Sequence, residues 1–132
     1  MLSGTSLVFD IETVPDVESG RRLHSLADLN DEDVARAMRT LRVQKTGGTD
    51  FLPHPEHRIV AISAVLRSPE KLRVWSLGSA DSSERELLER FFDGVEKFRP
   101  VLISWNGSGF DLPVIHYRSL KHGVSAPLYW ES

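Results

Sequence analysis

Short stretches in which apolar residues either alternate with polar ones or follow one another predict four strands. They are residues 6–14 ("SLVFDIETV"), 58–67 ("RIVAISAVLR"), 71–77 ("KLRVWSL") and 101–105 ("VLISW"). The second stretch is apolar at nearly every position, which predicts a central strand with both faces buried. Because only the turn "SPE" separates the second stretch from the third, these two predict an antiparallel hairpin.

Three other segments repeat their apolar residues at helical spacing. The first begins near Asn30 and ends at Gly47, within a helical insertion that we expect over residues 28–50. The second runs from the capping-box sequence at Ser83 to Pro100. The third covers residues 110–123, with a proline in its first turn and a glycine as its C-cap. The order of strands and helices predicts an α/β domain with a mixed sheet flanked by helices.

Composition narrows the possible chemistry. The chain has 132 residues, of which 40% are hydrophobic, enough for the core of a single domain. It lacks cysteine, which excludes disulfides and thiolate metal sites, so that a metal would be held by oxygen or histidine. Neither a membrane-spanning run nor a signal peptide is evident, and we expect a soluble, cytoplasmic protein. The net charge of −3 means that a nucleic acid would need a local basic patch to bind.

Asp10 and Glu12 are the first candidates for a functional site. Residues two apart on a strand project from the same face, with Cα atoms about 6.5 to 7 Å apart. Two such anions beside a buried strand raise each other's pKa unless a cation or hydrogen-bond donors lie between them. A divalent metal ion would relieve that repulsion. Alternatively, both acids are solvated where the strand ends at Pro15.

Asp111 is the third candidate. It follows the strand at 101–105 and the glycine-rich loop "NGSG", and it precedes a helix. A helical crossover would place this strand parallel to the first, so that both end at the same edge of the sheet. Asp111 would then approach Asp10 and Glu12, and three carboxylates would form a hard oxygen site suited to Mg²⁺ or Mn²⁺. The alternative is that Asp111 only caps its helix. A phosphate-binding role for the loop is disfavoured, because Leu112 stands where a dinucleotide fingerprint needs its third glycine.

The sequences "VFDIET" and "WNGSGFDLP" together resemble motifs one and two of the DEDD exonucleases. The resemblance is closest to the predicted 3'-5' exonucleases related to the proofreading domain of family B DNA polymerases. It spans Leu7 to about Gly123 and implies a ribonuclease H-like fold. It also implies an enzyme that releases nucleoside monophosphates from single-stranded DNA or frayed 3' ends, with RNA as a further possible substrate.

The same resemblance implies the roles of individual residues. Asp10 matches the carboxylate that bridges two divalent metal ions, Mg²⁺ or Mn²⁺, and Glu12 matches a ligand of the ion that activates water. Asp111 matches the acid of the second motif, which holds the other ion. Asn106 and Phe110 match the N-x-x-x-F-D pattern, in which the asparagine supports the site and the aromatic residue lies near the terminal nucleotide. Together with Thr13, they are the residues expected to bind substrate.

One part of the family pattern is missing from the chain. The third motif is a tyrosine or histidine four residues before an aspartate, and no aspartate follows Asp111. Tyr117 and Tyr129 lack a carboxylate at that spacing, and Glu131 is the only later acid. We therefore expect either a C-terminally truncated exonuclease domain or a degenerate nuclease-like module that binds nucleic acid or protein without catalysis.

A basic stripe on the first predicted helix is open to two interpretations. Its members recur every three residues: Arg36, Arg39, Arg42 and Lys45. They could follow the phosphates of a single strand, but a solvated helix face is the favoured interpretation. The histidines carry no metal-binding prediction, since sites for Mg²⁺ prefer oxygen ligands. Trp75 and Trp105 are predicted to be core residues.

Overall fold

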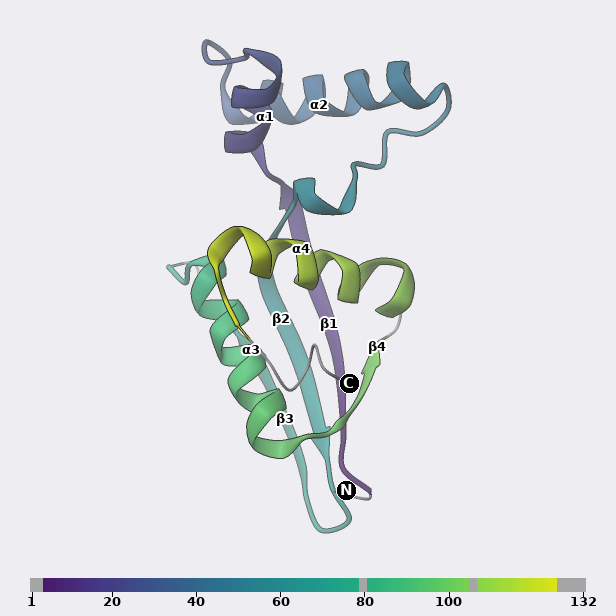
Figure 1. Cartoon of the computed structure of the whole chain (residues 1–132), viewed down its shortest axis with the longest axis vertical. Coiled ribbons are helices and arrows are strands. Elements are labelled where there is room, and N and C mark those ends of the chain that lie inside the picture. Colours follow the sequence, from purple (N-terminus) through teal and green to yellow (C-terminus); the bar gives the residue numbers. More distant parts are fainter. Residues whose placement is uncertain (1–3, 79–80, 105–106, 126–132) are drawn as a thin grey trace. The chain divides into compact units, whose positions relative to one another are not determined.

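The computed structural model describes residues 4–78, 81–104 and 107–125. The chain divides into two compact units, which are described separately. Unit 1 comprises Met1–Thr13 and Ile59–Ser132, and unit 2 comprises Val14–Arg58. The elements in chain order are β1 (Ser6–Pro15), α1 (Val17–His24), α2 (Asp31–Thr46), the 3₁₀ turn η1 (His54–Glu56), β2 (His57–Arg67), β3 (Leu72–Leu77), α3 (Glu84–Phe98), β4 (Val101–Ser104), the π-helical turn η2 (Gly107–Asp111) and α4 (Leu112–His122) (Figure 1).

The four strands form one mixed sheet in the order β3-β2-β1-β4. β1 and β4 are parallel, with a register from Ser6 opposite Val101 to Phe9 opposite Ser104. β2 and β3 are antiparallel, as predicted for the hairpin. The predicted parallel pairing of the first and fourth strands is therefore confirmed, as is the mixed α/β sheet.

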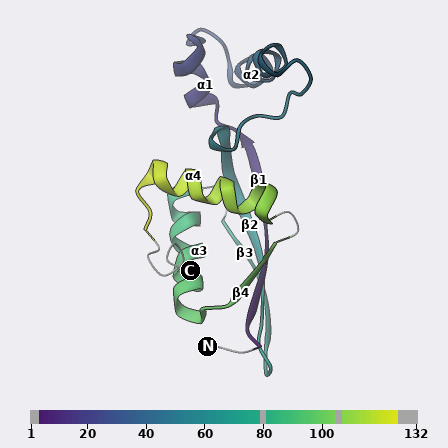
Figure 2. The ribbon, with the colours of Figure 1, turned by 45° about the vertical axis from the view of Figure 1, so that its right-hand side comes forward.

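One face of this sheet carries the core of unit 1. Helices α3 and α4 lie on the same side of the sheet (Figure 2). Their apolar residues meet those of β1 and β2 in a single cluster, in which the rings of Phe9 and Phe91 lie 5.0 Å apart between centroids. Trp75 packs against this cluster, which confirms its prediction as a core residue. The buried residues of the cluster are Leu7, Phe9, Ile11, Ile59, Ile62, Ala64, Leu66, Leu87, Leu88, Phe91, Phe92, Val95, Val114 and Ile115.

The opposite face of the sheet is open within the residues that the structure describes. Ile62 is fully buried, whereas Ser63, its neighbour on β2, is exposed. Val8 and Ile103, paired across β1 and β4, are also exposed. The prediction that both faces of β2 are buried is therefore wrong. An apolar sequence shows that a strand tolerates burial, but whether a layer covers it depends on the tertiary fold.

The ends of α3 and α4 follow the signals in the sequence. Ser83 accepts a hydrogen bond from the backbone amide of Glu86 (3.1 Å), which fixes the start of α3. In α4, Pro113 lies in the first turn, and Gly123 ends the helix with φ of 65°. This left-handed conformation is one that glycine adopts without strain.

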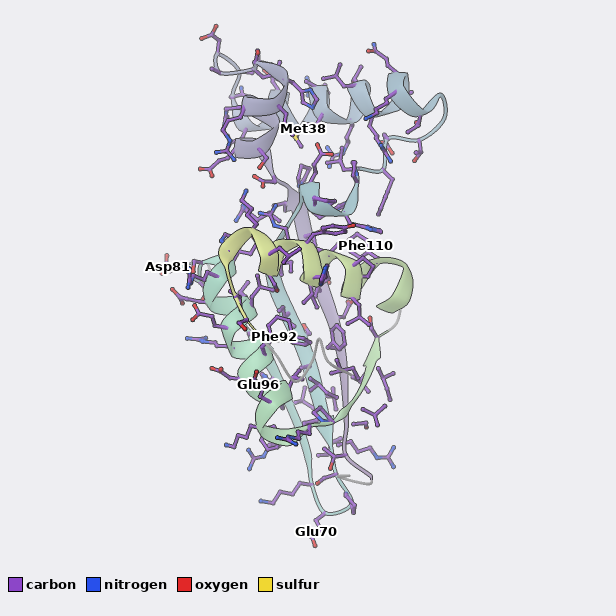
Figure 3. The ribbon with its side chains drawn as sticks, viewed as in Figure 1. Met38, Glu70, Asp81, Phe92, Glu96 and Phe110 are labelled. Carbon is purple, nitrogen blue, oxygen red and sulfur yellow. The ribbon has the colours of Figure 1, made fainter. Side chains whose placement is uncertain are left out.

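Unit 2 holds two helices and a small core of its own. α2 begins where Asn30 accepts from the amide of Asp33 (2.8 Å) and ends at Gly47, close to the predicted bounds. Its buried residues Val34 and Met38 pack with Leu52. Met38 points into the space between α1 and α2 (Figure 3).

α1 was not predicted from the sequence. It has eight residues and is capped by Asp16, whose carboxylate accepts from the amide (3.2 Å) and hydroxyl (2.7 Å) of Ser19. Its only buried residue is Gly20, where a Cβ would collide with the Met38 side chain. Val17 packs against the cluster of Val34, Met38 and Leu52, but Val17 and Leu23 are the only large apolar residues of α1, too few for a helical pattern in the sequence.

None of the helices in the described part of the chain combines the length and the apolar character needed to cross a membrane.

Candidate active site

β1 carries two of the predicted site residues on one face. Leu7, Phe9 and Ile11 point into the core, and the residues between them are exposed. Asp10 and Glu12 therefore share the open face of the sheet, as the alternation of the sequence predicts.

Asp111 reaches β1 from the end of β4. The β1–β4 register ends where Phe9 pairs with Ser104, so the next part of β1 extends beyond its parallel neighbour. The Asp111 side chain lies there, buried to 2% exposure. It accepts a hydrogen bond from the Ser104 hydroxyl (2.6 Å) and another from the backbone amide of Ile11. The carboxylate of Asp111 thus lies beyond the end of β4, next to the β1 backbone between Asp10 and Glu12.

Asp111 does not cap its helix. Although it stands at the N-cap position of α4, its side chain makes no capping hydrogen bond there. The turn before it, η2, is a π-helical turn, a geometry that is rare and concentrated at functional sites. The cap alternative for Asp111 is therefore wrong, and its carboxylate bonds instead to the two strands.

The surroundings of Asp111 disfavour its negative charge. Burial raises its pKa above the ordinary value of 3.8, and the Ser104 hydroxyl opposes that effect by stabilising the carboxylate. The nearby Asp10 charge raises the pKa further, while the hydrogen bond from the Ile11 amide lowers it. The net shift is upward, so the folded chain holds this carboxylate with too little positive charge around it.

The donor types at this edge fit a hard divalent cation. Asp10 and Asp111 are within electrostatic range of each other, and carboxylate oxygens are what Mg²⁺ and Mn²⁺ prefer. Across residues 4–78, 81–104 and 107–125, however, no three acids or histidines are close enough together to hold a metal ion. The structure thus brings Asp10 and Asp111 close enough to interact. A centre of three carboxylates that includes Glu12 stays a prediction.

The structure says less about the three residues predicted to contact substrate than about the acids. Thr13 is half-buried near the end of β1. Phe110 is also half-buried and packs against the core of unit 1 (Figure 3). Asn106, like Trp105, lies outside the described residues. Their substrate roles stay predictions.

A buried ion pair at the other end of α4 was not predicted. The Glu84 carboxylate accepts from the Arg118 guanidinium through Nε (2.9 and 3.0 Å) and Nη2 (2.7 Å). It also accepts from the Ile59 amide (2.7 Å), and the His122 Nε2 atom lies 2.7 Å from it. The network joins β2, α3 and α4.

A signal for this pair was present in the sequence. Arg118 lies three and four residues after Ile115 and Val114, so a cation occupies the buried stripe of α4. A buried guanidinium requires a buried acid. Arg118 is also seven residues after Asp111, about two helical turns, and the ion pair therefore anchors the helix that follows Asp111.

A parallel β1–β4 edge with two interacting carboxylates, in a sheet covered by helices on one face, is consistent with a ribonuclease H-like exonuclease domain. The chain belongs to the family of predicted 3'-5' exonucleases related to the exonuclease domain of PolB, whose model matches residues 49–132. This match includes Asp111, whereas Asp10 and Glu12 precede it.

The chain also resembles short segments of DNA polymerases. It is 51% identical over 39 residues to DNA polymerase 1 of Sulfurisphaera ohwakuensis, covering 30% of this chain and 4% of the polymerase. It is 46% identical over 48 residues to a DNA polymerase of Pyrococcus glycovorans, covering 36% and 6%. With the catalytic subunit of DNA polymerase epsilon from Saccharomyces cerevisiae it shares 47% identity over 45 residues, covering 33% and 2%. The matched part is thus a small fraction of the length of each relative.

Proposed function

We propose that this chain acts in a metal-dependent 3'-5' exonuclease that removes nucleoside monophosphates from single-stranded DNA or frayed 3' ends. One observation carries the proposal: Asp111 is buried against β1 beside Asp10, and its raised pKa reflects a carboxylate that needs a cation. Membership in the family of predicted 3'-5' exonucleases supports the same conclusion.

In this proposal the three acids of unit 1 hold the metal ions. Asp10 and Glu12 contribute from the open face of β1, and Asp111 contributes from the β4 edge. When bound, two divalent ions stabilise the charge on the entering and leaving oxygens of the phosphodiester. The hydroxyl of Ser104 and the amide of Ile11 orient Asp111 for that task and oppose the rise of its pKa. Thr13, Asn106 and Phe110 are proposed to position the terminal nucleotide.

The metal site is tested by titrating the chain with Mn²⁺ in a calorimeter. Asp10→Asn should weaken binding at least about tenfold, since it removes a charged oxygen ligand from the site. Asp93→Asn is the matched control, because Asp93 is an exposed aspartate on α3 and makes the same change of charge. Equal affinity in the wild type and both variants would exclude the proposed site.

Activity is tested with single-stranded DNA labelled at its 5' end. A 3'-5' exonuclease yields a ladder of products shortened from the 3' end in Mn²⁺ and no products in EDTA. Asp111→Asn should abolish the ladder. Internal cleavage, or shortening that persists in EDTA, would contradict the proposal.

A second candidate function is a nuclease-like module that binds nucleic acid without cutting it. The observation in its favour is that no residue pair after Asp111 in the given sequence matches the third motif. Mn²⁺ binding that depends on Asp10, together with a DNA strand that is bound but stays intact, would favour this candidate over the exonuclease.

A further inference from the structure

Unit 2 contains a cavity of about 270 Å³ with an apolar floor. The floor is made by Leu23 at the end of α1, by Met38 and Leu41 of α2, and by Leu52. Leu41 is 36% exposed, so part of the floor is open to solvent.

Basic side chains surround this floor. His24 lies at the end of α1, and Arg42 and Lys45 are one helical turn apart on α2. Glu56 contributes an acid to the same lining. The Arg42 Nε atom donates to the carbonyl of Phe51 (3.0 Å), which holds the guanidinium in position.

Some charges elsewhere on unit 2 are paired with one another. Arg21 pairs with Asp31, and Arg36 pairs with both Glu32 (3.6 Å) and Asp33 (3.3 Å). Within the described part of the chain, by contrast, no ion pair engages Arg42 or Lys45. Of the four members of the basic stripe, Arg36 is thus neutralised by neighbouring acids. Arg42 and Lys45 line the cavity and, like Arg39, form no ion pair in the described part of the chain.

We propose that this cavity binds one nucleotide of a single-stranded nucleic acid. The base contacts Leu23 and Leu41, the exposed apolar residues of the lining, and the phosphate pairs with Arg42 and Lys45. Its volume falls just below the range of about 300 to 1,000 Å³ that drug-sized ligands occupy, which suits one nucleoside better than a helix of a partner protein. An aliphatic floor contacts the face of a base and reads none of its edges, so binding has little sequence preference.

This site is independent of the proposed metal centre, because all of its residues belong to unit 2. Binding to the full chain can be measured in EDTA, where the proposed exonuclease is inactive. A failure of the nuclease proposal and a failure of this one are therefore observed separately.

The test is fluorescence anisotropy of a short fluorescein-labelled oligothymidylate over a series of salt concentrations. Lys45→Gln should weaken binding by about threefold to tenfold and lower the slope of log K against log salt by about 0.7, the value for one lost phosphate contact on a single strand. Arg39→Gln is the matched control: it removes the same charge from the same helix, but Arg39 lines a different groove, with Glu32 and Asp50. It should leave the slope unchanged.

The apolar floor is tested by Leu41→Ser. Because this side chain is partly exposed, the variant should fold, which an unchanged thermal transition would establish. It should weaken binding without changing the salt slope, since no phosphate contact is lost.

Three outcomes would overturn the proposal. They are an absence of binding even at low salt, equal losses for Lys45→Gln and Arg39→Gln, and displacement of the oligonucleotide by poly-glutamate as readily as by unlabelled oligothymidylate. The last outcome would assign the cavity to acidic polypeptides instead.

Discussion

The two ends of α4 each lie beside a buried carboxylate, and the surroundings of the two carboxylates are opposite. At the C-terminal end, Glu84 receives a guanidinium, a backbone amide and the imidazole of His122. At the N-terminal end, Asp111 receives a hydroxyl and a backbone amide, and it faces the negative charge of Asp10.

This difference separates an acid that the chain itself compensates from an acid that is a candidate for function. Glu84 is neutralised by the chain itself, so its burial needs nothing from outside. Asp111 is also buried, and its burial raises its pKa. A buried charge that its own protein leaves uncompensated is a candidate ligand for a cation.

The largest effect is expected from breaking the compensated pair. Arg118→Met should lower the free energy of unfolding by about 3 to 5 kcal/mol, because it leaves the Glu84 carboxylate buried without its cation. Urea unfolding followed by circular dichroism measures the loss. The double variant Glu84→Gln/Arg118→Met should recover part of it, since the uncompensated charge is then gone.

Arg36→Met is the control for that measurement. Arg36 pairs with Glu32 and Asp33 on the exposed surface of α2, where an ion pair contributes less than about 1 kcal/mol. Similar losses for Arg118→Met and Arg36→Met would mean that burial does not distinguish the Glu84 pair.

A smaller effect, at the other end of α4, is expected from Ser104→Ala. The Ser104 hydroxyl stabilises the ionised form of Asp111, so its removal should raise the pKa of Asp111 further. Hydrogen bonds to charged groups contribute about 1.5 to 3 kcal/mol, and this loss should appear only at pH values where Asp111 is ionised. Carboxyl NMR across a pH titration measures the shift.

Ser63→Ala is the matched control, because Ser63 is an exposed strand residue on β2. If both serine variants leave the Asp111 titration unchanged, the hydroxyl does not stabilise that carboxylate.

The sequence was sufficient to predict the approach of Asp111 to β1. Two local patterns, a strand with alternating acids and a strand–loop–helix unit, combine with the handedness of a parallel crossover to bring Asp111 to that edge. The bounds of α2 and α3 also followed from local capping residues, since Asn30 and Ser83 satisfy amides within their own first turns.

The missed features depend on contacts between distant segments. Glu84 lies in the first turn of α3, where a glutamate is usually solvated, and only the position of α4 explains its burial. The open face of β2 is similar: the apolar residues of the strand do not reveal that α3 and α4 pack on one side alone. α1 was missed because its packing depends on Gly20 and on few apolar side chains, which leave no helical pattern in the sequence.

The smallest effect is expected from Asp111→Asn, and its sign is opposite to those above. A carboxyl whose pKa is raised by folding binds its proton more tightly in the folded state. The stability of the wild type therefore falls as the pH rises above 3.8. It levels off once the pH exceeds the pKa of Asp111 in the folded state. Asparagine has no such proton to lose. In EDTA, the variant should therefore match the wild type near the acid end and exceed it in stability at neutral pH, which a thermal melt measures as a higher Tm.

Adding Mn²⁺ in excess of EDTA to the wild type and to Asp111→Asn tests the comparison between Asp111 and Glu84. A cation that neutralises Asp111 supplies what Arg118 supplies to Glu84, so it should raise the Tm of the wild type and leave that of Asp111→Asn nearly unchanged. Glu96→Gln controls for non-specific binding of Mn²⁺, because Glu96 lies on α3 outside the proposed site (Figure 3). An Asp111→Asn variant that is less stable than the wild type at neutral pH in EDTA would show that Asp111, like Glu84, is already compensated by its own chain.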